Sequence, residues 1–98
     1  MTINSNQDGK KLTVTLEGRL DTVTAPDLEA ELNKYMDSID ELVIDFTGIE
    51  YISSAGLRVL LMAHKAMSPK GGMKICGVGD IVREVFDVTG FSDILTIE

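Results

Sequence analysis

Short segments of strand length alternate with longer segments of helical periodicity, and this alternation restricts the fold more than any other feature of the sequence. Strands are predicted at residues 2–6, 11–17, 42–46, 73–76 and 94–97, and helices at about 25–37, 55–67 and 81–88. The order is therefore β-β-α-β-α-β-α-β. Strands that alternate with helices are joined by right-handed crossovers, so we expect an α/β fold with a mixed, mostly parallel sheet and helices packed against it.

The strand segments differ in how they are expected to be covered. Asp8-Gly9 is a strong hairpin turn signal, and the strand that follows it alternates apolar and polar residues, which predicts a half-buried strand. Residues 42–46 form a nearly continuous apolar run, which predicts a strand buried on both faces. The segments 18–23 and 49–54 are expected to be a loop and the connection into the second helix.

Boundary signals place the helices. Thr24, with Asp27 three residues later, resembles a capping box at the start of the first helix. Gly90 follows the third helix, where a left-handed glycine cap is common. The second helix carries two apolar stripes on roughly opposite faces. Either part of it is exposed as an apolar patch for a partner, or it is packed deeply between the sheet and its neighbours.

The length and charge of the chain limit the classes of protein to which it can belong. With 98 residues, we expect a single domain over residues 1–98. The net charge of −7, from 9 basic and 16 acidic residues, argues against binding to nucleic acid or to anionic membranes. One cysteine, Cys76, allows no internal disulfide and fits a reducing compartment. Neither a signal peptide nor a membrane-spanning run is present, so we expect a cytoplasmic protein without membrane insertion.

The sequence contains few of the residues and motifs that enzymes use for catalysis. One His and one Cys cannot assemble the usual zinc ligand sets, and there is no phosphate-binding P-loop. Ser54 precedes Gly56, but Ile52 stands where the hydrolase motif requires its first glycine. A triad of Ser54, His64 and an aspartate stays open on sequence alone, although His64 is better explained as a partly buried structural residue. We therefore predict a protein that is not an enzyme and uses no cofactor and no metal.

Two hydroxyl residues, Ser53 and Ser54, stand at the start of the second helix, after a central strand. In open α/β sheets, this kind of loop usually holds the functional site. The simplest interpretation is that one serine caps the helix. A helix start also exposes free backbone N–H groups and the positive end of the helix dipole, so a phosphate added there gains hydrogen bonds without unfolding the domain.

Three motifs together resemble the STAS family, the bacterial anti-sigma factor antagonists. Gly18-Arg19-Leu20-Asp21 is similar to the family's Gly-x-Leu/Ile-Asp after the second strand. Residues 42–46, followed by Tyr51-Ile52, are similar to its central strand and lead-in. Ser53-Ser54-Ala55-Gly56-Leu57 is similar to its Asp-Ser-Ser/Ala-Gly-Leu, and the order of elements agrees over about residues 3–97.

The resemblance implies a phosphoprotein that regulates transcription by partner switching. The unmodified protein binds an anti-sigma factor that is also a serine kinase, and this protein binding releases a sigma factor. The kinase then phosphorylates the antagonist, and a PP2C-type phosphatase resets it. The acceptor aligns with Ser54, with Asp21 nearby, and the protein is expected to be a monomer or a weak dimer. The partner-binding residues implied are Asp21, Thr22, Ser53, Ser54, Gly56, Leu57 and Arg58.

One departure from the family pattern bears on the function. Ser53 stands where the family has an aspartate, and this removes a carboxylate that would orient the acceptor hydroxyl. It also leaves Ser53 as an alternative acceptor. The second function that the resemblance allows is a STAS module that binds a partner without phosphorylation, in a transporter or a stressosome-like complex.

Overall fold

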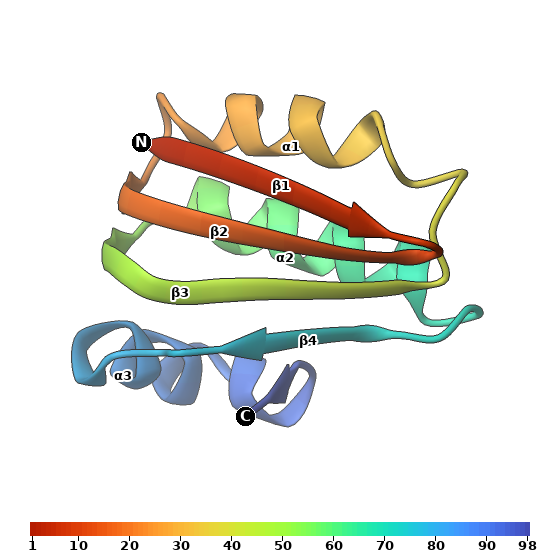
Figure 1. Cartoon of the computed structure of the whole chain (residues 1–98). Helices are drawn as coiled ribbons and strands as arrows, with labels where there is room; N and C mark the ends of the chain where they lie inside the picture. The colour runs from red at the N-terminus through yellow and green to blue at the C-terminus, as the bar shows by residue number, and fades with distance from the viewer.

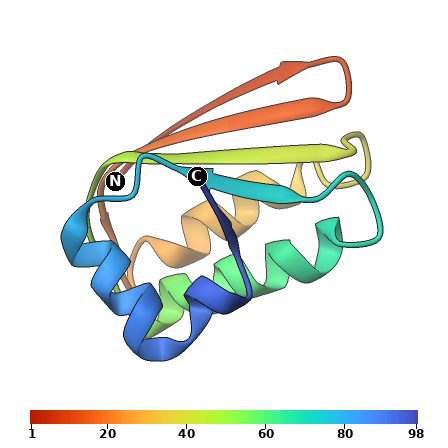
Figure 2. The ribbon, with the colours of Figure 1, turned by 90° about the horizontal axis from the view of Figure 1, so that it is seen from below.

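The computed structural model describes residues 1–98, which form a five-stranded sheet in the order β1-β2-β3-β4-β5 with the helices on one face (Figures 1 and 2). The strands are β1 (Thr2–Asp8), β2 (Lys11–Leu20), β3 (Glu41–Ile52), β4 (Met73–Cys76) and β5 (Thr96–Ile97). The helices are α1 (Ala25–Asn33), α2 (Ser54–Met67), α3 (Asp80–Thr89) and the short 3-10 helix η1 (Phe91–Asp93). The predicted order and the mixed α/β class are confirmed.

The sheet is antiparallel at one edge and parallel elsewhere. β1 and β2 form the predicted hairpin, with Asp8 opposite Lys11 and Gly9 at φ +62°, a conformation that glycine adopts readily. β2, β3, β4 and β5 then pair in parallel, each with the next. The carboxyl ends of the parallel strands therefore lie at one edge of the sheet, which is the left side of Figure 1.

The prediction that residues 42–46 are buried on both faces is wrong. Leu42, Ile44 and Phe46 are buried, but Val43 and Asp45 between them are only half-buried. Figure 2 shows why: α1, α2 and α3 all lie on the same side of the sheet, and no element covers the other side. The strand therefore alternates as a one-sided strand does, although its sequence is almost continuously apolar.

β2 and β3 are longer than predicted, because their pairing continues through register shifts past the point where we expected β3 to end. The Asp45 carboxylate accepts hydrogen bonds from the backbone N–H and the hydroxyl of Thr47, at 2.9 and 2.6 Å. Pairing with β2 resumes after register shifts, with Arg19 opposite Tyr51. Residues 18–20 and 49–52, predicted as a loop and a connection, are therefore strand; bulges of this kind re-aim the end of a strand.

Three smaller corrections concern element ends. α1 stops at Asn33 and not at residue 37, because Lys34 and Tyr35 bond three residues back and tighten the turn. Thr24 does not form a capping box: it has helical dihedral angles, and its side chain makes no cap hydrogen bond. The last strand is restricted to Thr96–Ile97, since η1 precedes it. Both α2 and α3 lie close to their predicted bounds, and Gly90 ends α3 at φ +82°.

The core lies between the inner face of the sheet and the helices. It contains 23 buried hydrophobic residues in one cluster and no buried polar residue. The core is mostly aliphatic, with one aromatic pair, Phe46 and Phe86, whose ring centroids are 6.1 Å apart. Of the two arrangements left open for α2, deep packing accounts for most of both stripes, but Leu61 and Met62 are half-buried and Ala66 is exposed. The buried residues of α2 are Gly56, Leu57, Val59, Leu60, Ala63 and Met67.

His64 is half-buried, as predicted for a structural histidine. None of the helices has the length and apolar character needed to cross a membrane.

Candidate functional site

The candidate site lies where β2 and β3 end and α1 and α2 begin (Figure 1). Asp21 and Thr22 lie in the loop between β2 and α1, whereas Ser53 joins β3 to α2. The two connections are tied together, because the backbone N–H of Ser53 donates a 2.9 Å hydrogen bond to the carbonyl oxygen of Leu20. The expectation that the Asp21 loop and the serine pair are neighbours is therefore confirmed.

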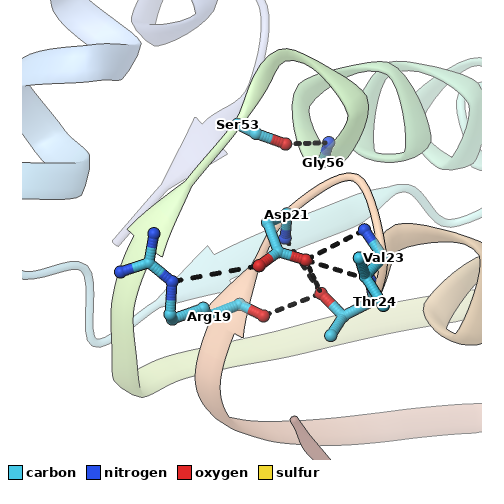
Figure 3. A network of polar contacts seen from close by, with 6 residues as sticks. All are labelled: Arg19, Asp21, Val23, Thr24, Ser53 and Gly56. Carbon is cyan, nitrogen blue, oxygen red and sulfur yellow. Dashed lines mark hydrogen bonds and ion pairs between the residues drawn. The ribbon is translucent and has the colours of Figure 1, made fainter.

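Hydrogen bonds within its own loop hold the Asp21 side chain (Figure 3). Its Oδ1 accepts from the backbone N–H groups of Val23 and Thr24, at 3.0 and 3.1 Å. The Thr24 hydroxyl accepts from the Asp21 N–H at 2.9 Å and donates to the Arg19 carbonyl at 2.7 Å. The backbone N–H of Thr24 is the main cause that lowers the pKa of Asp21 from its ordinary value, against the opposing effect of burial. Asp21 is thus a fixed carboxylate, charged at neutral pH.

Arg19 and Tyr51 form a pair at this edge that the sequence did not reveal. They are register partners at the ends of β2 and β3, and the guanidinium carbon of Arg19 lies 4.4 Å from the Tyr51 ring centroid. The Nε of Arg19 also lies 3.9 Å from Oδ2 of Asp21. That separation is long and the groups are partly exposed, so this ion pair is weak. The pair could have been found from the register of β2 and β3. That register could be predicted only if both segments were recognised as strands.

The two serines occupy different environments. Ser53 is the N-cap of α2 with extended backbone angles, and its hydroxyl accepts from the backbone N–H of Gly56 at 3.5 Å, the long end of the hydrogen-bond range. Ser53 is half-buried. Ser54 is the first residue of α2 and is exposed, and its side chain makes no hydrogen bond within the chain. Ser54 therefore presents a free hydroxyl to solvent, whereas Ser53 is part of the helix cap.

Gly56 and Leu57 are buried, so they support the site from the core side of α2. A Cβ atom on Gly56 would lie 2.7 Å from Cγ of Leu20, 2.9 Å from Cγ1 of Ile52 and 3.1 Å from the Leu20 carbonyl oxygen. Only a glycine allows α2 to approach the ends of β2 and β3 this closely. Leu57 is 7% exposed and belongs to the core cluster. Both residues therefore fix the position of Ser54 relative to the Asp21 loop.

A groove of about 410 Å³ runs between α1 and α2, beginning at their first turns. Two residues predicted as partner-binding, Thr22 and Arg58, line it from opposite sides. Glu29 is the other charged lining residue, and the rest is mostly apolar. Sequence reasoning missed this groove, because it forms only when α1 and α2 pack side by side. The lining residues are Thr22, Ala25, Pro26, Glu29, Ala55, Arg58, Val59 and Met62.

Known proteins resemble this chain along nearly its whole length. BtrV of Bordetella bronchiseptica, named as an anti-sigma factor antagonist, is 38% identical over 88 residues, which cover 88% of this chain and 76% of that protein. The crystal structure of an anti-sigma factor antagonist from Mycobacterium paratuberculosis has a TM-score of 0.88 at 27% identity, covering 98% of this chain and 83% of that one.

More distant similarity extends to the phosphorylated form of the Bacillus cell fate determinant SpoIIAA. It has a TM-score of 0.77 at 14% identity, covering 99% of this chain and 91% of that one, and this shows a shared fold. The STAS domain family model matches residues 2–98. The chain therefore belongs to the STAS domain family.

Proposed function

We propose that this protein is an anti-sigma factor antagonist whose activity is switched by phosphorylation of Ser54. The observation that carries the proposal is the exposed, unbonded hydroxyl of Ser54 at the start of α2, beside the loop that holds Asp21. The names of the relatives support the antagonist role, and SpoIIAA is a protein of this fold with a phosphorylated form. In this proposal the protein acts in the cytoplasm by binding and not by catalysis.

The environments of the two serines favour Ser54 over Ser53 as the acceptor. Phosphorylation of Ser53 would remove the hydroxyl that caps α2, whereas the Ser54 hydroxyl has no structural contact to lose. Serine and aspartate are both preferred at the N-cap, so Ser53 can cap the helix in place of the aspartate of the family pattern. Because Ser53 carries no charge, the carboxylate at this site comes from Asp21 in the neighbouring loop.

The charge of the phosphate provides the release step. A phosphate on Ser54 adds about two negative charges at neutral pH to a protein whose net charge is already −7. Asp21 is charged there as well, since its loop hydrogen bonds lower its pKa. A partner that binds over both residues, such as a kinase that is also the anti-sigma factor, would be repelled or left with an uncompensated charge. A PP2C-type phosphatase would restore the binding form.

A phosphorylation assay tests the proposal. The tagged protein is used to recover its partner kinase from the host, and ATP is then added and the intact mass measured. We expect one phosphate on wild type, none on Ser54→Ala and one on the matched variant Ser53→Ala. Binding of the kinase should be lost in Ser54→Asp. Full modification of Ser54→Ala, or a loss confined to Ser53→Ala, would show that the acceptor is assigned wrongly.

The substitution of Ser53 for the family's aspartate favours a second candidate function. In that case the chain would be an interaction module that is never phosphorylated, within a transporter or a stressosome-like complex. The same recovery experiment separates the two candidates. Recovery of transporter subunits without any ATPase-fold kinase would support the module and contradict the switch.

A further inference from the structure

Arg58 lies one helical turn after Ser54 on α2, and both residues are exposed. Residues four apart on a helix are surface neighbours, with Cβ atoms about 5–6 Å apart. Side chains on a helix lean toward its N-terminus, so the Arg58 side chain leans toward Ser54 and not away from it. A group added to the Ser54 hydroxyl is therefore within reach of the Arg58 guanidinium.

Arg58 is also free to take a new partner. The chain contains five ion pairs, and Arg58 takes part in none of them. Arg19, a second arginine at this edge of the sheet, already contacts both Asp21 and the Tyr51 ring. Moving Arg19 to a phosphate would break both contacts, whereas moving Arg58 would break no ion pair.

Arg58 also lines the groove between α1 and α2. The groove carries one positive and one negative side chain, Arg58 on α2 and Glu29 on α1. A partner segment that enters the unmodified groove therefore meets a guanidinium at one wall. If Arg58 turned to a phosphate, Glu29 would be the charged side chain left facing the groove.

We propose that Arg58 is the intramolecular counter-ion of phosphoserine at position 54, and that this pairing withdraws the positive charge from the groove. The inference rests on the proposed phosphorylation of Ser54. Guanidinium and phosphate form charge-assisted, often bidentate hydrogen bonds, and a neutral serine hydroxyl offers no comparable attraction. Modification thus acts on a partner twice: it adds negative charge at Ser54, and it removes from the groove the cation that an acidic group of the partner would contact.

Phosphorus NMR on protein with phosphoserine installed at position 54 during translation tests the pairing without any kinase. A nearby cation favours the dianion and lowers the second pKa of the phosphate. An exposed pair at this spacing is weak, so we expect Arg58→Gln to raise that pKa by about 0.3 units, and high salt to reduce the difference. Lys65→Gln removes an equal charge from the same helix at about 16 Å from Ser54 and should leave the pKa unchanged.

The variants distinguish this inference from its alternatives. A pKa in Arg58→Gln equal to that in Lys65→Gln would overturn the pairing, and so would a shift found in Arg19→Gln alone. Arg58→Lys should retain part of the effect, because the charge stays and the bidentate geometry is lost. Failure of the kinase to modify Ser54 would contradict the proposed function and leave the NMR result standing, so the two failures are separable.

Discussion

Replacing Gly56 with alanine should separate α2 from the strand ends that hold the Asp21 loop. The added methyl group would lie 2.7 Å from the Leu20 side chain, 2.9 Å from the Ile52 side chain and 3.1 Å from a backbone carbonyl oxygen. The two side chains are buried, at 0% and 3% exposure, so neither can swing into solvent. The strain can be relieved only if the first turn of α2 moves away from β2 and β3.

The size of the effect follows from two opposing contributions. Overpacking a well-filled core costs about 1–3 kcal/mol. Alanine is favoured over glycine inside a helix by about 1 kcal/mol, and by less in the first turn, where Gly56 stands. We therefore expect a net loss of about 1–2 kcal/mol in unfolding free energy. For a domain of this size, that lowers the thermal midpoint by about 5–15 °C.

Thermal unfolding followed by circular dichroism measures the midpoint, and Gly79→Ala is the matched control. Gly79 also lies at the start of a helix, but it has φ −78° and no atom within 4 Å of an added Cβ. Gly79 is the N-cap of α3, where alanine is less favourable than glycine, so that variant should lose at most about 1 kcal/mol and less than Gly56→Ala. Equal midpoints for the two variants would refute the reasoning, because they would mean that the close approach of α2 to Leu20 constrains nothing.

Two further predictions concern titratable groups. Backbone hydrogen bonding, from Thr24 above all, lowers the folded-state pKa of Asp21, so the stabilisation is present above the unfolded value and is lost as pH falls through the folded one. Urea unfolding should show wild type more stable than Asp21→Asn at about pH 6, with the gap closing below about pH 4; a constant gap would contradict this. Burial, and then Asp45 and Glu98, raise the pKa of the Cys76 thiol. Cys76 should therefore react with iodoacetamide at about pH 8 more slowly than a free cysteine peptide, and an equal rate would contradict this.

The order of elements was predictable because each strand and helix carries a local signal. The Asp8-Gly9 turn, the helix over 54–67 and the left-handed Gly90 all depend on residues close in sequence. The length of β2 and β3 was not predictable in the same way. Their last residues are held by pairing across a bulge, as Arg19 pairs with Tyr51, and no local pattern records that contact.

The sequence also failed to predict that one face of the sheet is uncovered, and the reason is different. An almost continuous apolar run cannot tell a strand buried on both faces from a strand with one apolar residue on its open face. Val43 is that residue, and it pairs with Thr13 on one side and Lys74 on the other. The polar neighbours already pointed to an uncovered face, but reading them required the register of the sheet. Asp45 within the run was the one local warning.

The candidate site was predictable in its members and not in their contacts. The rule that parallel strands end at one edge places Asp21 beside the serine pair, and a hydrogen bond from Ser53 to Leu20 joins the two loops. The same rule does not say which serine is free, because that depends on which one occupies the N-cap. Nor does it show the groove between α1 and α2, to which Thr22 and Arg58 belong.

The packing of α2 bears on how the proposed modification of one hydroxyl would act on the surface around it. Gly56 and Leu57 fix the first turn against the core, so Ser54 cannot withdraw when it is modified. Asp21 is equally held by its own loop. A phosphate on Ser54 would therefore have to be accommodated by exposed side chains, and Arg58 is exposed and has no ion-pair partner. In the proposed switch, a well-packed helix start beside an exposed, unpaired arginine would convert a local charge into a different binding surface without any change of fold.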